Sequence, residues 1–245
     1  MPSTVQVVLW TMLIAVSSCT SPMSAPAAKA PETRAALVPL ENTGMHPRNL
    51  ELAELAKTNA NAKVVFLGDS ITQSWKDGGL DVWEREFAQY SALNLGVSGD
   101  RTEHVLWRLA SGAYDKLHPK VIVSMIGTNN TGHRMDPPAD IAAGVKEILA
   151  QLKKRFPNTR LALLAIFPRG EAPDDPMRKN NDATNALLVG IAKDAGASWL
   201  DLSRAFLDAK GVLSKDLMPD LLHPNTRGYE IWANAIRDPL KHWME

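Results

Sequence analysis

The sequence predicts an α/β fold in which helices cover both faces of a parallel sheet, a three-layer α/β/α sandwich. From about Leu50 onward, short runs rich in Val, Ile and Leu alternate with segments whose apolar residues recur at helical spacing. The short runs are almost continuously apolar, which is typical of strands buried on both faces. Strands that alternate with helices are joined by right-handed crossovers, so the sheet is expected to be parallel.

The expected elements follow one another along most of the chain. The strand candidates are Lys63–Leu67, Ala92–Leu95, Lys120–Ile126, Arg160–Phe167 and Ser198–Leu202. The helical segments are Leu50–Asn59, Thr102–Ala110, Ala139–Arg155, Asn181–Ala195 and Thr226–Trp243. Active sites of such open sheets lie beyond the carboxyl ends of the strands, so functional residues are expected directly after strands.

Length and composition suit one domain with an N-terminal tail. The chain has 245 residues, of which 45% are hydrophobic and 22% are charged. Lys+Arg and Asp+Glu both number 27, so no basic excess is available to neutralise phosphates, which argues against a nucleic-acid binder. The single cysteine, Cys19, excludes an intramolecular disulfide and a cysteine zinc cluster.

The N-terminus resembles that of a bacterial lipoprotein. Residues 5–16 are mostly apolar, too few to span a bilayer but suited to the core of a signal peptide. Val16-Ser17-Ser18-Cys19 resembles a lipobox, in which Cys19 receives the lipid. Met1 to Thr4 carry no Lys or Arg, unlike a typical signal, so plain export and a cytoplasmic protein are the alternatives.

We therefore expect three parts and an envelope location. Residues 1–18 form the signal peptide, residues 19–40 an extended tether rich in Ala, Pro and Ser, and residues 41–245 the folded domain. The expected protein is an exported lipoprotein of the bacterial cell envelope, held at the membrane through Cys19. A periplasmic or secreted protein is the alternative.

Three strand candidates are followed by residues that suit acyl transfer. Ser70 comes after the strand ending at Leu67, although a lone serine there is more typically a helix N-cap. Gly96 follows Leu95 and allows its backbone N–H to approach a substrate oxygen, although it could also be a turn glycine. Asn129 follows the third strand; adjacent asparagines usually mark a turn, but one amide could donate to an oxyanion.

An Asp-x-x-His pair precedes the last helical segment. Asp220 and His223 are spaced so that the carboxylate and the imidazole can meet within one turn of chain. Asp220 can then hold one ring nitrogen while the other accepts the proton of Ser70, without which a serine hydroxyl is a poor nucleophile. Each feature alone is weak, but together they indicate a serine ester hydrolase.

The joint pattern resembles the SGNH (GDSL-type) hydrolases, named for the residue types found here at Ser70, Gly96, Asn129 and His223. Segments 68–73, 94–102, 105–109, 119–123, 127–130, 168–170 and 228–229 are similar to the catalytic subunits of platelet-activating-factor acetylhydrolase type Ib. The resemblance covers about residues 63–243 and implies a flavodoxin-like fold with a five-stranded parallel sheet. Ile71 replaces the usual Leu, and the lipobox and tether are foreign to the intracellular animal enzymes.

The resemblance also implies a reaction that needs no metal or other cofactor. Ser70 would attack the ester carbonyl, His223 would accept its proton and Asp220 would orient the imidazole. The oxyanion would be held by the backbone N–H groups of Ser70 and Gly96 and by the Asn129 amide.

The resemblance points to a short acyl group, acetyl first. The expected substrate is an acetylated glycan or a small-molecule ester; a lysophospholipase or lipase and a non-catalytic binding lipoprotein are the alternatives. Trp75 could bound the acyl pocket or pack in the core, and His133 could line the pocket. The animal relatives pair, so a homodimer is one option.

Overall fold

A five-stranded parallel sheet forms the centre of the computed structural model, which describes residue 1 and residues 34–245. The strands are Val64–Gly68 (β1), Leu93–Gly96 (β2), Val121–Met125 (β3), Arg160–Leu164 (β4) and Ser198–Leu200 (β5). Their order in the sheet is β2-β1-β3-β4-β5, and every pair is parallel. The α/β class and the five-stranded parallel sheet are confirmed.

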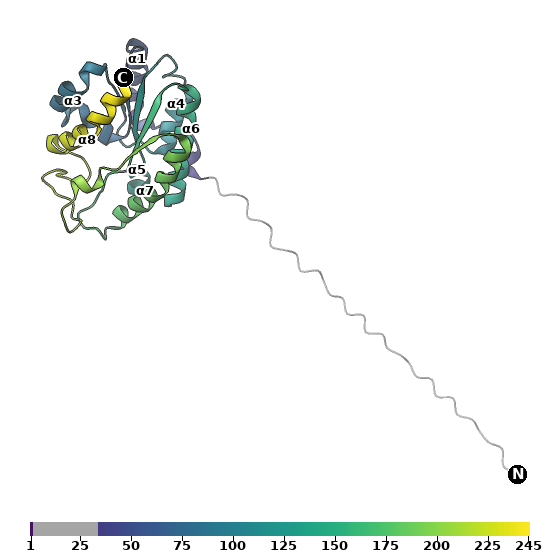
Figure 1. Cartoon of the computed structure of the whole chain (residues 1–245). Helices are drawn as coiled ribbons and strands as arrows, with labels where there is room; N and C mark the ends of the chain where they lie inside the picture. The colour runs from purple at the N-terminus through teal and green to yellow at the C-terminus, as the bar shows by residue number, and fades with distance from the viewer. Residues whose placement is uncertain (2–33) are drawn as a thin grey trace. The chain divides into compact units, whose positions relative to one another are not determined.

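Helices cover both faces of the sheet. The longer ones are His46–Thr58 (α1), Thr102–Ala110 (α4), Pro138–Arg155 (α6), Pro176–Ala195 (α7) and Thr226–Met244 (α8). The shorter ones are Ser70–Gln73 (α2), Leu80–Glu86 (α3) and Thr128–Arg134 (α5). In Figure 1, α3 and α8 lie on one side of the strands, and α4, α6 and α7 lie on the other.

The alternation of side chains along each strand divides the core into two layers. Val65 and Leu67 of β1 belong to a buried cluster that includes side chains from α1, α4, α6 and α7. Val64 and Phe66, one residue out of step, belong to a second cluster with side chains from α3 and α8. Because successive strand residues point to opposite faces, an almost continuously apolar strand is needed to fill both layers.

The observed elements differ from the predicted ones mainly around the strand ends. The helix Thr102–Ala110 is found as expected, whereas α7 begins earlier than predicted, at Pro176. A helix start near Ser70 was expected and α2 begins there, whereas α3 and α5 were not predicted. All three are short, and α5 contains the adjacent asparagines that favoured a turn.

Residues 35–40 belong to the folded unit, which corrects the predicted tether boundary. A turn of 3₁₀-helix at Ala35–Leu37 leaves Ala36 only 2% exposed. Thr102 Oγ1 donates a hydrogen bond of 2.9 Å to the Ala36 carbonyl, and the Leu40 N–H donates to the Glu103 carbonyl. These contacts hold the segment against α4, although its Ala-rich sequence resembles the preceding tether.

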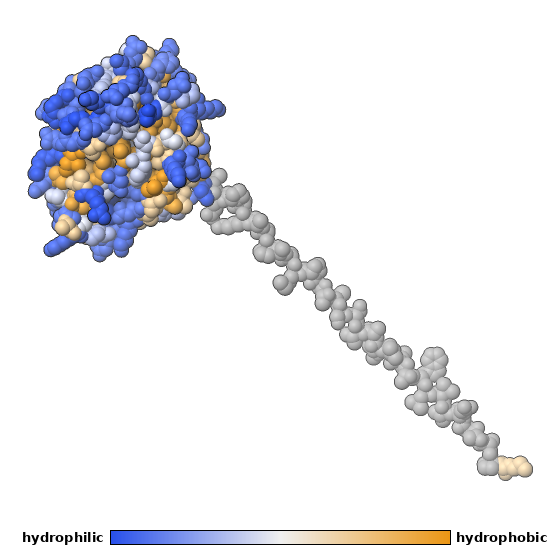
Figure 2. Space-filling view, viewed as in Figure 1, coloured by the Kyte–Doolittle hydropathy of each residue, from blue (hydrophilic) through white to orange (hydrophobic). Residues whose placement is uncertain are grey.

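The remaining N-terminal predictions lie outside the described residues. They concern the signal peptide, Cys19 and most of the tether. In the part of the chain that the structure describes, no helix is long and apolar enough to cross a membrane. The face of the folded unit in Figure 2 is mostly hydrophilic, with hydrophobic areas in separate patches.

Candidate active site

Ser70 lies at the carboxyl end of β1, as the first residue of α2. The residue that caps this helix is Asp69, whose Oδ1 accepts a hydrogen bond of 3.0 Å from the Ile71 N–H. The capping alternative for Ser70 is therefore wrong, because its neighbour performs that role. The Ser70 hydroxyl is left available for another interaction.

His223 and Asp220 complete a hydrogen-bonded chain that begins at Ser70. His223 Nε2 lies 2.9 Å from Ser70 Oγ, and His223 Nδ1 lies 2.6 Å from Asp220 Oδ2. When Nδ1 carries the proton it donates to Asp220, and Nε2 can accept the hydrogen bond of the serine hydroxyl. The structure thus brings Ser70 together with His223, a residue 153 positions further along the chain, and with its neighbour Asp220.

His223 is held by the loop that precedes α8. Asp220 Oδ1 accepts hydrogen bonds from the backbone N–H groups of Leu222 and His223, at 3.0 and 2.7 Å. The Gly170 N–H donates to the Leu221 carbonyl, which fastens this loop to the segment after β4. In α8, the helix that follows this loop, the Tyr229 hydroxyl donates to the Ile71 carbonyl at 2.7 Å and so links α8 to α2.

The electrostatics of Asp220 suit its place beside the imidazole. Although partial burial acts to raise it, hydrogen bonds from the His223 ring and backbone hold the pKa of Asp220 below its ordinary value. The carboxylate therefore stays ionised around neutral pH and can stabilise a positive charge on His223. The two side chains are 56% and 34% exposed, so the pair lies at the surface.

The structure does not support the predicted role of the Gly96 backbone. Its N–H donates a hydrogen bond of 2.9 Å to Asn94 Oδ1 and is therefore occupied. A side chain at this position would collide with the backbone of Thr72 and Gln73, so the glycine is needed where β2 passes α2. The prediction failed because sequence does not reveal which way an edge-strand amide points.

Gly99, three residues further on, was missed. It has a φ of +72°, a left-handed conformation that favours glycine. Within residues 34–245 its N–H makes no hydrogen bond. The Ser-Gly-Asp turn after the strand was the signal that could have identified it, because a left-handed glycine in a turn can present its amide to a ligand.

Asn129 lies in the first turn of α5, at the carboxyl end of β3. One hydrogen of its Nδ2 is donated to the Asp100 carbonyl at 3.0 Å, which leaves the other hydrogen for a ligand. The adjacent Asn130 is completely buried and bonds to Thr102, Glu103 and Asp136. Of the two asparagines, only Asn129 is therefore free to serve a substrate.

A buried polar network lies beneath this side of the site. Arg108, 2% exposed, pairs with the fully buried Asp100 at 2.9 Å and also donates to the carbonyls of Leu95 and Gly68. Asp69 is 1% exposed, and its Oδ2 has no hydrogen-bond partner among the described residues. Burial raises the pKa of Asp69 to about 7.

The two residues proposed to border the substrate pocket have different environments. Trp75 is fully buried among Phe66, Phe87 and Tyr229, so it packs in the core. His133 lies beside the guanidinium of Arg101 and lines a groove of about 440 Å³ that also includes Ser98 and Gly99. His133 therefore lies beside the Gly99 turn, and its place in the substrate pocket stays a prediction.

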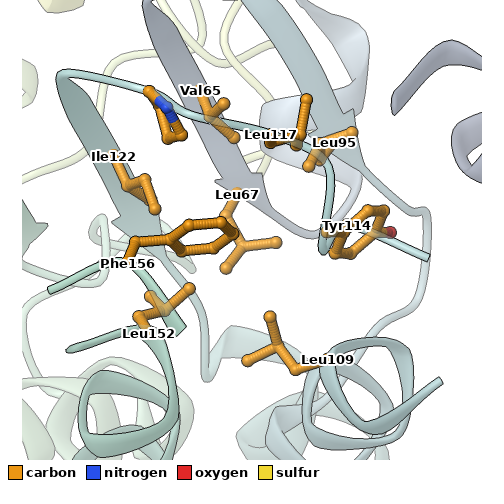
Figure 3. A pocket seen from close by; sticks show the side chains of 10 residues that line it. Val65, Leu67, Leu95, Leu109, Tyr114, Leu117, Ile122, Leu152 and Phe156 are labelled. Carbon is orange, nitrogen blue, oxygen red and sulfur yellow. The ribbon is translucent and has the colours of Figure 1, made fainter. Parts of the chain in front are cut away.

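The described residues offer no cluster of metal ligands, and the core contains a small apolar cavity. In the described part of the chain, no group of three or more His, Cys, Asp or Glu side chains could hold a metal ion. An enclosed apolar cavity of about 10 Å³ lies in the core, lined by side chains such as Leu67, Leu109 and Phe156 (Figure 3). Its volume corresponds to about one water, so it is a packing gap.

Comparison with known sequences identifies the family. The model of the GDSL-like lipase/acylhydrolase family matches residues 66–231. The human platelet-activating factor acetylhydrolase IB subunit alpha1 is 36% identical over 179 residues, which cover 73% of this chain and 75% of the relative. The mouse alpha2 subunit is 37% identical over 183 residues, covering 74% and 77%.

Solved structures share the fold. A GDSL-like lipase from Bacteroides thetaiotaomicron has a TM-score of 0.67 and 18% identity, over 79% of this chain and 97% of that chain. An acetylxylan esterase from Geobacillus stearothermophilus has a TM-score of 0.60 and 20% identity, over 72% of this chain and 93% of that chain. Together with the sequence matches, they place this chain in the GDSL-like lipase/acylhydrolase family, and it is a carboxylic ester hydrolase.

Proposed function

We propose that the protein hydrolyses short-chain esters, acetyl esters first, with acetylated carbohydrates as the expected natural substrates. Ser70 is the nucleophile, His223 the general base and Asp220 the residue that orients it. The observation that carries this proposal is the continuous chain of contacts, 2.9 Å from Ser70 Oγ to His223 Nε2 and 2.6 Å from His223 Nδ1 to Asp220 Oδ2.

The reaction proceeds in two acyl-transfer steps. Ser70 Oγ bonds to the ester carbonyl carbon while its proton passes to His223 Nε2, and the tetrahedral intermediate expels the alcohol, which takes that proton. Water then attacks the acetyl-serine, again losing a proton to His223, and releases acetate and the free serine. Throughout, the ionised Asp220 stabilises the positive imidazole.

Three donors are available for the oxyanion. The Ser70 N–H lies in the first turn of α2, where backbone amides lack partners inside the helix. Asn129 Nδ2 contributes its remaining hydrogen, and the free N–H of Gly99 takes the place first assigned to Gly96. The bond from Asn129 to the Asp100 carbonyl supports this assignment because it holds the Gly99 turn next to the amide.

A short acyl group is supported by two observations. The relatives that are 36–37% identical are named acetylhydrolases, and a structural neighbour is named an acetylxylan esterase.

Substrate comparison tests the proposal. We expect kcat/KM for p-nitrophenyl acetate and acetylated xylooligosaccharides to exceed that for p-nitrophenyl palmitate. Ser70→Ala should abolish turnover, whereas Ser91→Ala, before the amino end of β2, should leave it intact. Faster cleavage of the palmitate ester would instead favour a lipase or lysophospholipase, and turnover that survives Ser70→Ala would reject the mechanism.

Export and lipid attachment at Cys19 are a separate proposal that rests on the sequence alone. Metabolic labelling with a radioactive fatty acid tests it in the full-length protein. The label should appear in the wild type and be absent from Cys19→Ala. Equal labelling of both would contradict a lipid anchor at this residue.

A further inference from the structure

Arg169 differs from most arginines of the described chain because it has no carboxylate partner. The ion-paired arginines are Arg34, Arg48, Arg85, Arg101, Arg108, Arg134, Arg155 and Arg237. Among residues 34–245, no carboxylate oxygen lies within 4.0 Å of Arg169, although the side chain is partly buried. Burial lowers the pKa of Arg169, and the carboxylates of Asp175, Asp69 and Asp220 act on it from a distance.

The guanidinium is held in a fixed position by α5. Its Nη1 donates to the carbonyl of Thr128 at 2.7 Å and to the Thr128 hydroxyl at 3.1 Å. It lies close to Gly132, where an added Cβ would come within 2.5 Å of Nη1 and 2.9 Å of Nη2. An arginine that is preorganised in this way loses little conformational entropy when it binds a ligand.

One edge of the guanidinium is unused. Nε and Nη2 make no hydrogen bond with any described residue, since both bonds of this side chain come from Nη1. These two nitrogens form the side of the guanidinium that binds a planar carboxylate through two parallel N–H···O bonds. The available donors therefore match a carboxylate in geometry as well as in charge.

Arg169 stands between the two halves of the catalytic machinery. On one side it binds the carbonyl of Thr128, the residue directly before Asn129. On the other side the next residue, Gly170, donates to Leu221, which lies between Asp220 and His223. Asp220 and Asp69 are also close enough to act on the charge of Arg169, so a ligand group at this guanidinium would lie near the oxyanion donors and on the side of the Asp220–His223 loop.

Three arginines, Arg169 among them, also act on His133 of α5. Partial burial and the charges of Arg101, Arg169 and Arg134 lower the pKa of His133. Arg101 and Arg134 are compensated by Glu103 and Asp136, so Arg169 supplies the positive charge that is not neutralised by an ion pair.

We propose that Arg169 binds a carboxylate carried by the alcohol portion of the ester substrate, an inference that rests on the proposed function. An acetyl group contains no ionisable group, so a carboxylate that binds Arg169 must belong to the alcohol portion of the ester. The preferred substrates would then be acetyl esters of acidic alcohols, such as the hydroxyl groups of a sugar acid. Arg169 thus sets the preference of the enzyme for a negatively charged alcohol portion.

Two small esters of the same shape test the proposal. 4-Acetoxybenzoate carries a carboxylate, and 4-acetoxybenzamide is its neutral counterpart. The kcat/KM of each ester is divided by its rate constant for hydrolysis by hydroxide, which corrects for the different intrinsic reactivities of the two esters. We expect the wild type to prefer the benzoate. Arg169→Gln should lower that preference by about tenfold to a hundredfold, the usual worth of hydrogen bonds to a charged group.

Further variants separate charge, geometry and folding. Arg169→Lys keeps the charge without the paired donors and should retain only part of the preference. Gly132→Ala displaces the guanidinium without removing it and should also reduce the preference. Arg160→Gln, an exposed arginine at the opposite end of β4, is the matched control and should leave the preference unchanged.

A binding measurement keeps this inference separate from the proposed function. Calorimetry should detect tighter binding of 4-hydroxybenzoate than of 4-hydroxybenzamide, and Arg169→Gln should abolish the difference even if the protein cleaved neither ester. Equal handling of the charged and neutral ligands by the wild type, or a preference that survives Arg169→Gln, would overturn the proposal.

Discussion

The two halves of the candidate site are built in different ways. The proposed oxyanion half, at the ends of β2 and β3, rests on buried polar groups: Asp100 and Asn130 are 0% exposed and Arg108 is 2% exposed. The base half is a surface loop in which His223 and Asp220 are 34% and 56% exposed. The first is tied into the core, whereas the second is held largely by hydrogen bonds within the loop.

This difference corresponds to what each half has to do. Oxyanion donors are effective when they are oriented before charge develops, which a buried network achieves. The base must reach Ser70 and also exchange protons with the alcohol and with water, which an exposed side chain can do. We therefore expect substitutions in the base half to affect activity more than stability, and substitutions in the buried half to affect stability more.

The largest expected effect is the loss of activity in His223→Ala. Without its base, Ser70 should lose roughly 10⁴-fold or more in kcat. The melting temperature should change little, because the side chain is one-third exposed. Steady-state kinetics with p-nitrophenyl acetate and thermal unfolding measure both, with the exposed His118→Ala as control. A strongly lowered melting temperature would show that the His223 side chain also contributes to stability, contrary to what we expect of the base half.

Asn129→Ala should lower kcat by about 10²–10³-fold, the usual cost of losing one oxyanion donor. KM should change much less, because the donor acts mainly on the charge of the transition state. A change confined to KM would show that Asn129 binds the ground state instead.

Asn130→Ala serves as the matched control for its neighbour. Removing a buried amide that makes several hydrogen bonds should lower the free energy of unfolding by about 1–3 kcal/mol or more. The folded fraction should keep most of its kcat. Denaturant unfolding measures the loss of stability, and active-site titration gives kcat per folded molecule. A loss of kcat larger than that of Asn129→Ala would mean that Asn130, not Asn129, is the oxyanion donor.

Asp69→Asn should change the pH dependence of stability. Burial raises the pKa of Asp69 from 3.8 to about 7, so folding takes up a proton between these values. The free energy of unfolding that Asp69 contributes is therefore greatest below about pH 4, where the carboxyl group is protonated. This contribution is lost as the pH rises through 7. Asparagine cannot ionise, and its carbonyl oxygen can still cap α2.

The variant should therefore gain stability relative to the wild type as pH rises from 4 to 8, by roughly a few kcal/mol. Melting temperatures of both proteins across this range measure the difference. Parallel curves would mean that Asp69 does not take up a proton on folding.

The smallest expected effect belongs to Tyr229→Phe. It removes the hydrogen bond of 2.7 Å that links α8 to the carbonyl of Ile71 in α2. The free energy of unfolding should fall by about 1 kcal/mol, and kcat by less than tenfold. A larger fall in kcat at unchanged stability would show that this contact helps to position the base.

Sequence reasoning succeeded where local pattern and tertiary structure agree. The strand Val64–Gly68 and the helix Thr102–Ala110 follow from periodicity. The contact of Ser70 with His223 and Asp220 follows from a serine placed after a strand and an Asp-x-x-His pair placed before the last helix. It failed where the outcome depends on direction or on distant contacts. The orientation of the Gly96 N–H, the packing of Ala36 against Thr102 and the unpaired state of Arg169 are all set by residues remote in sequence.

If Ser70 is a nucleophile activated by His223, a fluorophosphonate should react with it. Intact-protein and peptide mass spectrometry should then detect one adduct per chain, located on Ser70, absent from Ser70→Ala and formed much more slowly in His223→Ala. An adduct on another residue, or undiminished labelling of Ser70→Ala, would contradict this role of Ser70.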